Sequence, residues 1–268
     1  AVGGAMGVAF SGNLFTLYLF YEIVSVITYP LVMHHQDREG YEGGKKYVII
    51  LFFTSKAFLL TAMVLIYLAC GTLDFSTLGV LKGIFPAGSG KTLVLSSYFL
   101  CLFGFAQAGV TPFFNWLPSA RTAPAPVSVF LYAVVVVMVG IFSVCRMMLS
   151  IYGVNLLEKT GLGLTTAYIV SFTLIMASLI ALTKTNLKSR LVYSTISQLS
   201  YIILGVSLLT PNGITGGMIH IVNLAFSNVT LFFCAGVIFI TLGKEDIREM
   251  EGIGYLMPVT MTAFALSL

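Results

Sequence analysis

Long hydrophobic runs separated by short polar segments extend along the whole of this chain. A helix that crosses a membrane needs roughly 20 mostly apolar residues, and seven runs are about that long: Leu14–Met33, Tyr47–Cys70, Thr92–Thr111, Pro126–Leu149, Gly163–Leu182, Leu191–Leu209 and Gly213–Leu242. Two shorter runs lie at the chain ends, Ala1–Phe10 and Tyr255–Leu268. The pattern predicts seven complete membrane spans and two partial ones, and we interpret the chain as a fragment of a longer subunit.

Composition narrows the class of protein. Of the 268 residues, 58% are hydrophobic and only 9% are charged, and the mean hydropathy is +0.99. A soluble domain carries about 25% charged residues, so a soluble enzyme, a nucleic-acid binder and a disordered chain are all excluded. The runs have helix length and lack the alternation of a membrane barrel. We therefore expect an all-α polytopic membrane protein that lies in the lipid bilayer and binds no nucleic acid.

Lys and Arg residues between the spans predict the orientation, because cytoplasmic loops carry more of both. Nine basic residues lie in one set of alternate loops, 34–46, 112–125, 183–190 and 243–254. The other set, 71–91, 146–162 and 210–212, holds four. We therefore expect loop 34–46 to be cytoplasmic.

Neither the loop motifs nor the cysteines indicate a cofactor site. The stretch from Ala87 to Thr92 is similar to a phosphate loop, but Phe85 stands where that motif needs its first glycine. The four cysteines lie singly in apolar surroundings without metal-ligand spacing. We expect no cofactor and no metal, and any redox chemistry would belong to partner subunits.

Glu22 and Lys56 are the charged residues that fall within predicted spans. Glu22 precedes Met33 by 11 residues, and Lys56 follows Lys46 by 10. At 1.5 Å per residue, both lie about 15–17 Å from the same membrane face, and the two helices are joined by a short loop. We expect the two side chains to face the interior and to pair. Such charges mark transport sites by default, with a static structural ion pair as the alternative.

Two regions combine helix-breaking and polar residues. Gln107, Gly109 and Pro112 interrupt one apolar run, and such breaks are tolerated where they line a polar path. Gly213–Leu242 is long for a single span and carries His220, Asn223 and Asn228. We expect helix breaks in both regions.

Spacing along the later spans predicts a polar face. His220 and Asn223 are three residues apart, so they share one side of a helix. Ser194 and Ser197 make the preceding span polar near its basic end. We predict a hydrated path there, although Ser and Thr often bond only their own helix backbone.

Several stretches together resemble the proton-translocating, antiporter-like subunits of respiratory complex I, Mrp cation/proton antiporters and membrane-bound hydrogenases. The resemblance covers nearly the whole chain. The matching stretches are Asn13 to Glu22, Pro112 to Pro118, Ala123 to Ser128, Leu191 to Tyr201, and His220 to Asn223.

The resemblance implies inverted five-helix repeats with broken transmembrane helices. Residues 1–150 would form the first repeat and 151–268 the incomplete second one. The buried glutamate of the family matches Glu22, and one histidine matches His220. Titratable residues of the family fall on four positions where this chain has other residues: Gln107, Tyr132, Leu224 and Asn228. Lys56 stands where the family does not usually carry a charge.

These matches imply a membrane subunit of a proton or cation/proton translocating complex, with other membrane subunits as partners. We expect it in a prokaryotic inner membrane and expect it to move protons, with Na⁺ as the alternative ion. Glu22, Lys56 and His220 would transfer protons, and Gln107, Tyr132, Ser194, Ser197, Asn223 and Asn228 would line the polar path. A structural or coupling paralogue that does not conduct, and a stand-alone transporter of an organic substrate, are the alternatives.

Overall fold

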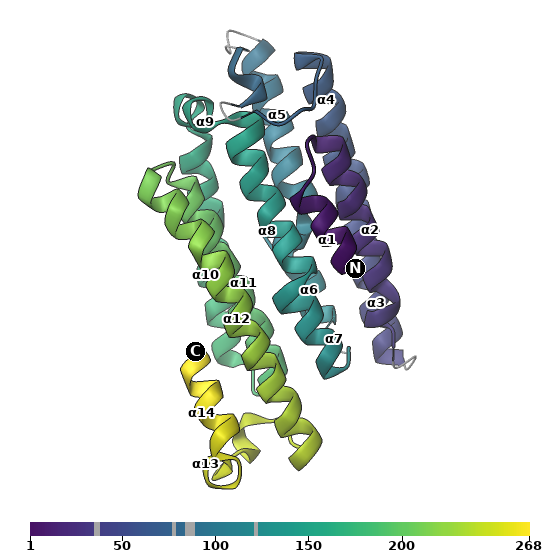
Figure 1. The fold of residues 1–268 in the computed structure, drawn as a ribbon, viewed down its shortest axis with the longest axis vertical. Coiled ribbons are helices and arrows are strands. Elements are labelled where there is room, and N and C mark those ends of the chain that lie inside the picture. Colours follow the sequence, from purple (N-terminus) through teal and green to yellow (C-terminus); the bar gives the residue numbers. More distant parts are fainter. Residues whose placement is uncertain (35–37, 77–78, 84–88, 121–122) are drawn as a thin grey trace.

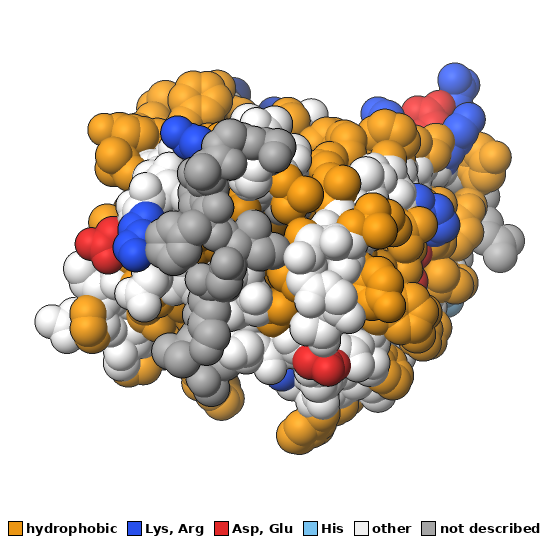
Figure 2. Space-filling view, turned by 90° about the horizontal axis from the view of Figure 1, so that it is seen from above, with side chains coloured by type: hydrophobic (Ala, Val, Ile, Leu, Met, Phe, Trp, Pro, Cys, Tyr) orange, Lys and Arg blue, Asp and Glu red, His pale blue; other side chains and the backbone are white. Residues whose placement is uncertain are grey.

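The protein is a bundle of helices that lie nearly parallel to its long axis (Figure 1). The computed structural model describes residues 1–34, 38–76, 79–83, 89–120 and 123–268, and it shows no β-strand among them. Within these described ranges, five helical stretches are long and apolar enough to cross a membrane: Leu14–Val32, Arg38–Cys70, Pro126–Tyr152, Leu162–Thr183 and Pro211–Leu242. Hydrophobic side chains cover much of the outer rim in the view along the long axis (Figure 2). The prediction of an all-helical polytopic membrane protein is confirmed.

The first half of the chain contains many short helical elements. They are α1 (Val2–Ala9), α2 (Leu14–Val32), α3 (Arg38–Thr54), η1 (Ser55–Leu59), α4 (Leu60–Cys70), η2 (Val80–Gly83), α5 (Ser89–Gly104), η3 (Ala106–Ala108), η4 (Phe113–Asn115), α6 (Trp116–Ser119), α7 (Ala125–Val129), η6 (Phe130–Val134), α8 (Val136–Arg146) and η7 (Met147–Tyr152). Of these, η1, η6 and η7 are π-helical turns.

The second half is more regular. It comprises α9 (Val154–Thr160), α10 (Leu162–Thr183), α11 (Leu187–Ser207), α12 (Pro211–Leu242), η8 (Ile247–Glu249), α13 (Ile253–Leu256) and α14 (Pro258–Ser267). Helix α11 packs against both α10 and α12. Helix α8 contacts α2 on one side and α11 on the other, so it joins the two halves (Figure 1).

The segments between the predicted spans lie at two opposite ends of the bundle. Alternate segments lie at the same end, as expected for helices that cross a membrane back and forth. At one end, a polar hollow of about 410 Å³ is lined by residues of three segments, including Lys46, Ser119 and Lys184. The 183–190 segment also bonds the 243–254 segment, through the Leu187 N–H and the Glu245 carbonyl (2.9 Å). At the other end, the Leu14 N–H donates to the Leu73 carbonyl (2.9 Å).

Two of the predicted boundaries are wrong. Helix α3 begins at Arg38, so most of the described part of loop 34–46 is helical; Glu42 is paired with Arg38 one turn away (3.3 Å) and supports this extension. The segment 146–162 is mostly helical, since α8 and η7 continue to Tyr152 and α9 follows. The stretch that is similar to a phosphate loop lies partly outside the described residues.

Helix α12 is continuous from Pro211 to Leu242, and the predicted break within it is wrong. Glycines near its start allow close packing: a Cβ on Gly217 would lie 2.9 Å from the Ile202 carbonyl oxygen, and one on Gly213 would lie 2.6 Å from that of Gly205. Small residues let membrane helices approach closely. His220 and Asn228 of α12 bond to neighbouring elements, and these bonds do not require a broken backbone.

The break after α5 is confirmed. Helix α5 ends at Gly104, the single turn η3 follows, and Gly109 has a φ of 71°, which favours glycine. The Trp116 Nε1–H donates to the Ala106 carbonyl (2.8 Å), which also accepts from the Gly109 N–H (3.0 Å), so the indole ties η3 to the start of α6.

Candidate functional site

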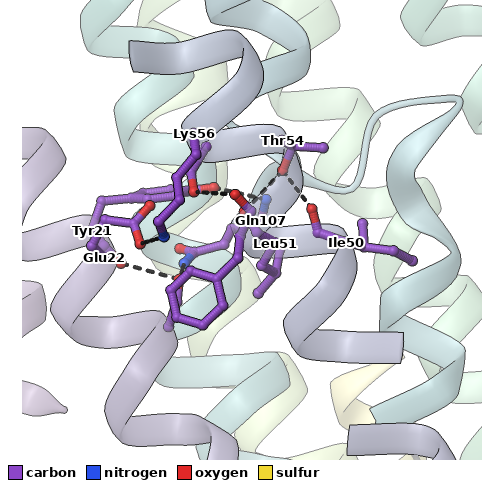
Figure 3. Close-up of polar contacts among 10 residues, drawn as sticks. Tyr21, Glu22, Ile50, Leu51, Thr54, Lys56 and Gln107 are labelled. Atoms are coloured by element: carbon purple, nitrogen blue, oxygen red, sulfur yellow. Dashed lines mark hydrogen bonds and ion pairs between the residues drawn. The ribbon is translucent and has the colours of Figure 1, made fainter. Parts of the chain in front are cut away.

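Glu22 of α2 and Lys56 of η1 form an ion pair. The Lys56 ammonium donates to Glu22 Oε2 at 3.1 Å (Figure 3). The ammonium also lies 3.8 Å from the centre of the Phe52 ring, a cation–π contact. The predicted pairing is therefore observed in the structure.

The two partners differ in their surroundings. The Glu22 side chain is 15% exposed and the Lys56 side chain is 55% exposed. The expectation that both face the interior is met for Glu22 and is wrong for Lys56. The stem of Lys56 starts on the outer side of its helix, and its ammonium reaches inward to Glu22.

The π-helical turn at Ser55–Leu59 contains Lys56 and packs against α5. A Cβ on Gly104 would lie 2.8 Å from the Leu59 backbone nitrogen, so the end of α5 is pressed against this turn. A π-turn adds a residue to one turn of a helix and is frequent at functional sites.

Gln107 lies at the helix break and is fully buried. Its backbone N–H donates to the Tyr21 hydroxyl (3.1 Å), and its Nε2 donates to the Ser25 hydroxyl (2.7 Å). Ser25 is one helical turn from Glu22, so the Gln107 amide and the Glu22 carboxylate lie beside the same face of α2. Figure 3 shows Gln107 beside the ion pair.

Two buried oxygens at this site have no hydrogen-bond donor among the described residues: Glu22 Oε1 and Gln107 Oε1. An unsatisfied buried polar group costs about 1–3 kcal/mol. Both oxygens can accept a hydrogen bond from water, and the carboxylate oxygen can also accept a proton.

Tyr132 and Asn228 form a second polar contact, between the two halves of the chain. The Tyr132 hydroxyl donates to the Leu117 carbonyl (2.7 Å), and its ring stacks on Phe232 at 5.1 Å between centroids. Asn228 Nδ2 donates to the Tyr132 carbonyl (3.3 Å), and Asn228 Oδ1 accepts from Thr195 (3.4 Å).

The remaining predicted residues are spread over α11 and α12. His220 Nε2 lies 3.0 Å from Gln198 Oε1, whereas Asn223, one turn further along α12, is exposed. The Ser197 hydroxyl is 2.9 Å from that of Ser178. Ser194 and Ser197 line a largely apolar cavity of about 610 Å³.

Sequence reasoning missed Tyr21, Ser25 and a threonine pair. Thr173 donates to Thr111 Oγ1 (2.8 Å) and accepts from the Thr111 N–H (3.2 Å), next to the break. Ser25, one turn after Glu22, had a usable signal in its spacing. No sequence signal indicated Thr173, because its partner Thr111 is 62 residues away.

Among the described residues, no group of three or more His, Cys, Asp or Glu side chains could hold a metal ion.

Known proteins with similar sequences are membrane subunits of redox and antiporter complexes. The chain is 28% identical to NAD(P)H-quinone oxidoreductase chain 5 of Synechocystis, with 97% of this chain and 39% of that protein aligned. It is 30% identical to a Na⁺/H⁺ antiporter subunit of Alkalihalophilus pseudofirmus, over 100% of this chain and 34% of that protein. The chain thus spans well under half the length of these relatives.

Solved structures show the same fold. A chain of the membrane-bound sulfane sulfur reductase, an archaeal respiratory membrane complex, superposes with a TM-score of 0.85 at 30% identity, covering 98% of this chain and 53% of that one. A chain of the Mrp complex of Dietzia superposes with a TM-score of 0.84 at 24% identity, covering 98% and 48%. The family profile described as "NADH:quinone oxidoreductase/Mrp antiporter, TM" matches residues 11–268. The chain therefore belongs to the NADH:quinone oxidoreductase/Mrp antiporter transmembrane family.

Proposed function

We propose that this chain is part of a proton-translocating subunit of a multisubunit membrane complex, and that Glu22 is its proton-binding group. The observation that carries the proposal is the Glu22–Lys56 pair beside the broken helix. Glu22 is largely buried and ionically paired through one oxygen, and its other oxygen has no donor among the described residues. A buried carboxylate that is paired through one oxygen can take up a proton when its ion pair with Lys56 opens, and can release the proton when the pair forms again.

The surroundings of Glu22 support a hydrated connection towards the protein centre. Gln107 Oε1 is a second buried acceptor without a donor among the described residues, and the hydroxyls of Tyr21 and Ser25 flank it. Buried water typically occupies such polar sites. Gln107, Tyr132 and Asn228 do not titrate near neutral pH, so they would conduct by holding water. His220, with Ser194, Ser197 and Asn223, would serve the more distant part of the path.

The relatives supply the context for the rest of the proposal. They include subunits named for quinone reduction, for Na⁺/H⁺ and for K⁺/H⁺ antiport. These names support H⁺ as the proposed transported ion, with Na⁺ as the alternative. Partners would be other membrane subunits in a prokaryotic inner membrane, with loop 34–46 cytoplasmic. Residues 1–150 and 151–268 would form two inverted repeats of one continuous membrane domain.

The second candidate function is a structural or coupling role without conduction. The hydrogen bonds of Tyr132 and Asn228 favour it: Tyr132 binds the Leu117 carbonyl, and Asn228 binds the Tyr132 carbonyl. These contacts fix helices in place without any group that titrates near neutral pH. The chain would then anchor neighbouring subunits that pump.

Proton flux into liposomes that contain the assembled complex separates the two functions. Glu22→Gln keeps the shape of the side chain and removes its charge. Glu158→Gln, at an exposed carboxylate of α9, is the matched control. We expect Glu22→Gln to abolish flux through this subunit while the complex still assembles, and Glu158→Gln to leave flux unchanged. Normal flux from an assembled Glu22→Gln complex would overturn the proton-binding role and favour the structural one.

A further inference from the structure

A continuous outward face runs along α3, η1 and α4, with Lys56 at its centre. Its residues recur every three or four positions: Ile49, Phe53, Lys56, Leu60, Val64 and Tyr67. Such spacing places them on one side of a helix. The five apolar members are 41–56% exposed, and the Lys56 side chain is 55% exposed. We name this set the Lys56 face.

The depth of Lys56 makes its exposure to lipid unfavourable. Lys56 is 10 residues from Lys46 and 14 from Cys70, which corresponds to about 15 and 21 Å along the helix. A lysine near a helix end can extend its ammonium to the interface, but a side chain starting this far from both ends cannot. The apolar members of the face indicate that it lies in a membrane or a protein interface rather than in water.

Glu22 does not saturate the ammonium. An ammonium has three N–H donors, and Glu22 Oε2 is its hydrogen-bond acceptor among the described residues, with the Phe52 ring adding a cation–π contact. Charged groups at this depth ordinarily face protein or a water-filled cavity. The outward side of Lys56 is therefore complementary to an oxygen acceptor that the described part of this chain does not provide.

We propose that the Lys56 face is a docking surface for a transmembrane helix of another subunit, and that this helix presents an Asp, Glu, Asn or Gln oxygen to Lys56. The apolar residues on either side of Lys56 would pack against the partner helix. The acceptor at the centre would fix its register, because an unpaired ammonium in an interface is costly. The proposal does not depend on whether the chain conducts protons.

Site-specific photocrosslinking in native membranes tests it. The photoreactive amino acid benzoylphenylalanine replaces Phe53 or Leu60, which flank Lys56 by about one turn each, in the full-length subunit within its complex. We expect adducts at both positions to one transmembrane helix of a different polypeptide. Mass spectrometry should place an Asp, Glu, Asn or Gln within one helical turn of the adduct.

The charge is tested with two further variants, each normalised to the amount of membrane-inserted subunit. Lys56→Met should reduce the adduct yield several-fold, and Lys56→Arg should restore it, because arginine keeps the donor. Adducts to lipid alone, to another transmembrane helix of the same subunit, to a second copy of this chain, or to a helix without a side-chain oxygen at that depth would overturn the proposal. An unchanged yield in the Lys56→Met variant would overturn the role of the charge in docking.

Discussion

Gly140 of α8 lies directly against the backbone of Gln107: a Cβ added at Gly140 would come within 2.4 Å of the Gln107 carbonyl carbon and within 2.4 Å of the Ala108 nitrogen. No side chain fits in this space. The helix break is therefore held from one side by α8, and from the other by the bonds of Gln107 to Tyr21 and Ser25 on α2.

Gly140→Ala should destabilise the protein and displace Gln107, because the obstructing atoms belong to the backbone and cannot rotate away. Overpacking of this kind costs about 1–3 kcal/mol. Thermal unfolding of the purified protein in detergent measures the effect. Gly216→Ala is the matched control, since nothing lies within 4 Å of a Cβ at that position on α12. An equal melting temperature for both variants would contradict the close contact.

Tyr21→Phe removes the hydroxyl that accepts the Gln107 N–H, leaving a buried backbone donor without its partner. We expect a loss of about 1–3 kcal/mol in the free energy of unfolding. Tyr168→Phe provides the control, because the Tyr168 side chain is exposed on α10. Faster amide hydrogen exchange at residues 106–108 in Tyr21→Phe should accompany the loss. Unchanged exchange there would show that the bond does not hold the break.

The Glu22–Lys56 pair should show unequal single-mutant effects. Lys56→Met leaves the largely buried Glu22 carboxylate without a cation, whereas Glu22→Gln leaves the more exposed Lys56 ammonium. We therefore expect Lys56→Met to destabilise more than Glu22→Gln. Unfolding measurements on both single variants and the double variant should give a favourable coupling free energy of about 0.5–3 kcal/mol. Additive effects would mean that the ion pair does not contribute to stability.

Arg146 should be sensitive to replacement by lysine. Its guanidinium donates to the carbonyls of Ala9 and Ser11, each at 2.7 Å, and lies 4.4 Å from the centre of the Phe75 ring. Lysine keeps the charge but lacks the planar fork that reaches both carbonyls.

Arg146→Lys should therefore lower the melting temperature and loosen the connection between α1 and α2. Limited proteolysis near residues 10–13 would detect that loosening. Arg38→Lys is the control, because Arg38 is 93% exposed and pairs with Glu42 on the helix surface. If Arg146→Lys is as stable and as protease-resistant as this control, the two carbonyl contacts are not important for the connection.

The sequence by itself determined the features that depend on local composition and periodicity. Apolar runs of membrane-spanning length marked the helices, and the run of Gly, Pro and Gln near 107 marked the break. The equal depth of Glu22 and Lys56 also followed, because depth depends only on the rise per residue and the position of the span ends. Residue spacing within a span sets the side of the helix, but it does not say what covers that side.

The tertiary structure decided which surface each polar group faces and what it bonds. Gln107 meets Ser25 across 82 residues of chain, and Asn228 meets Tyr132 across 96. Such contacts arise from helix packing, which no local pattern encodes. The continuity of α12 was also a packing result, since α11 and η6 provide partners for His220 and Asn228, two of the residues that indicated a break. The exposure of Lys56 was also a result of the tertiary structure, because residue spacing along a span does not say which side of the helix the bundle covers.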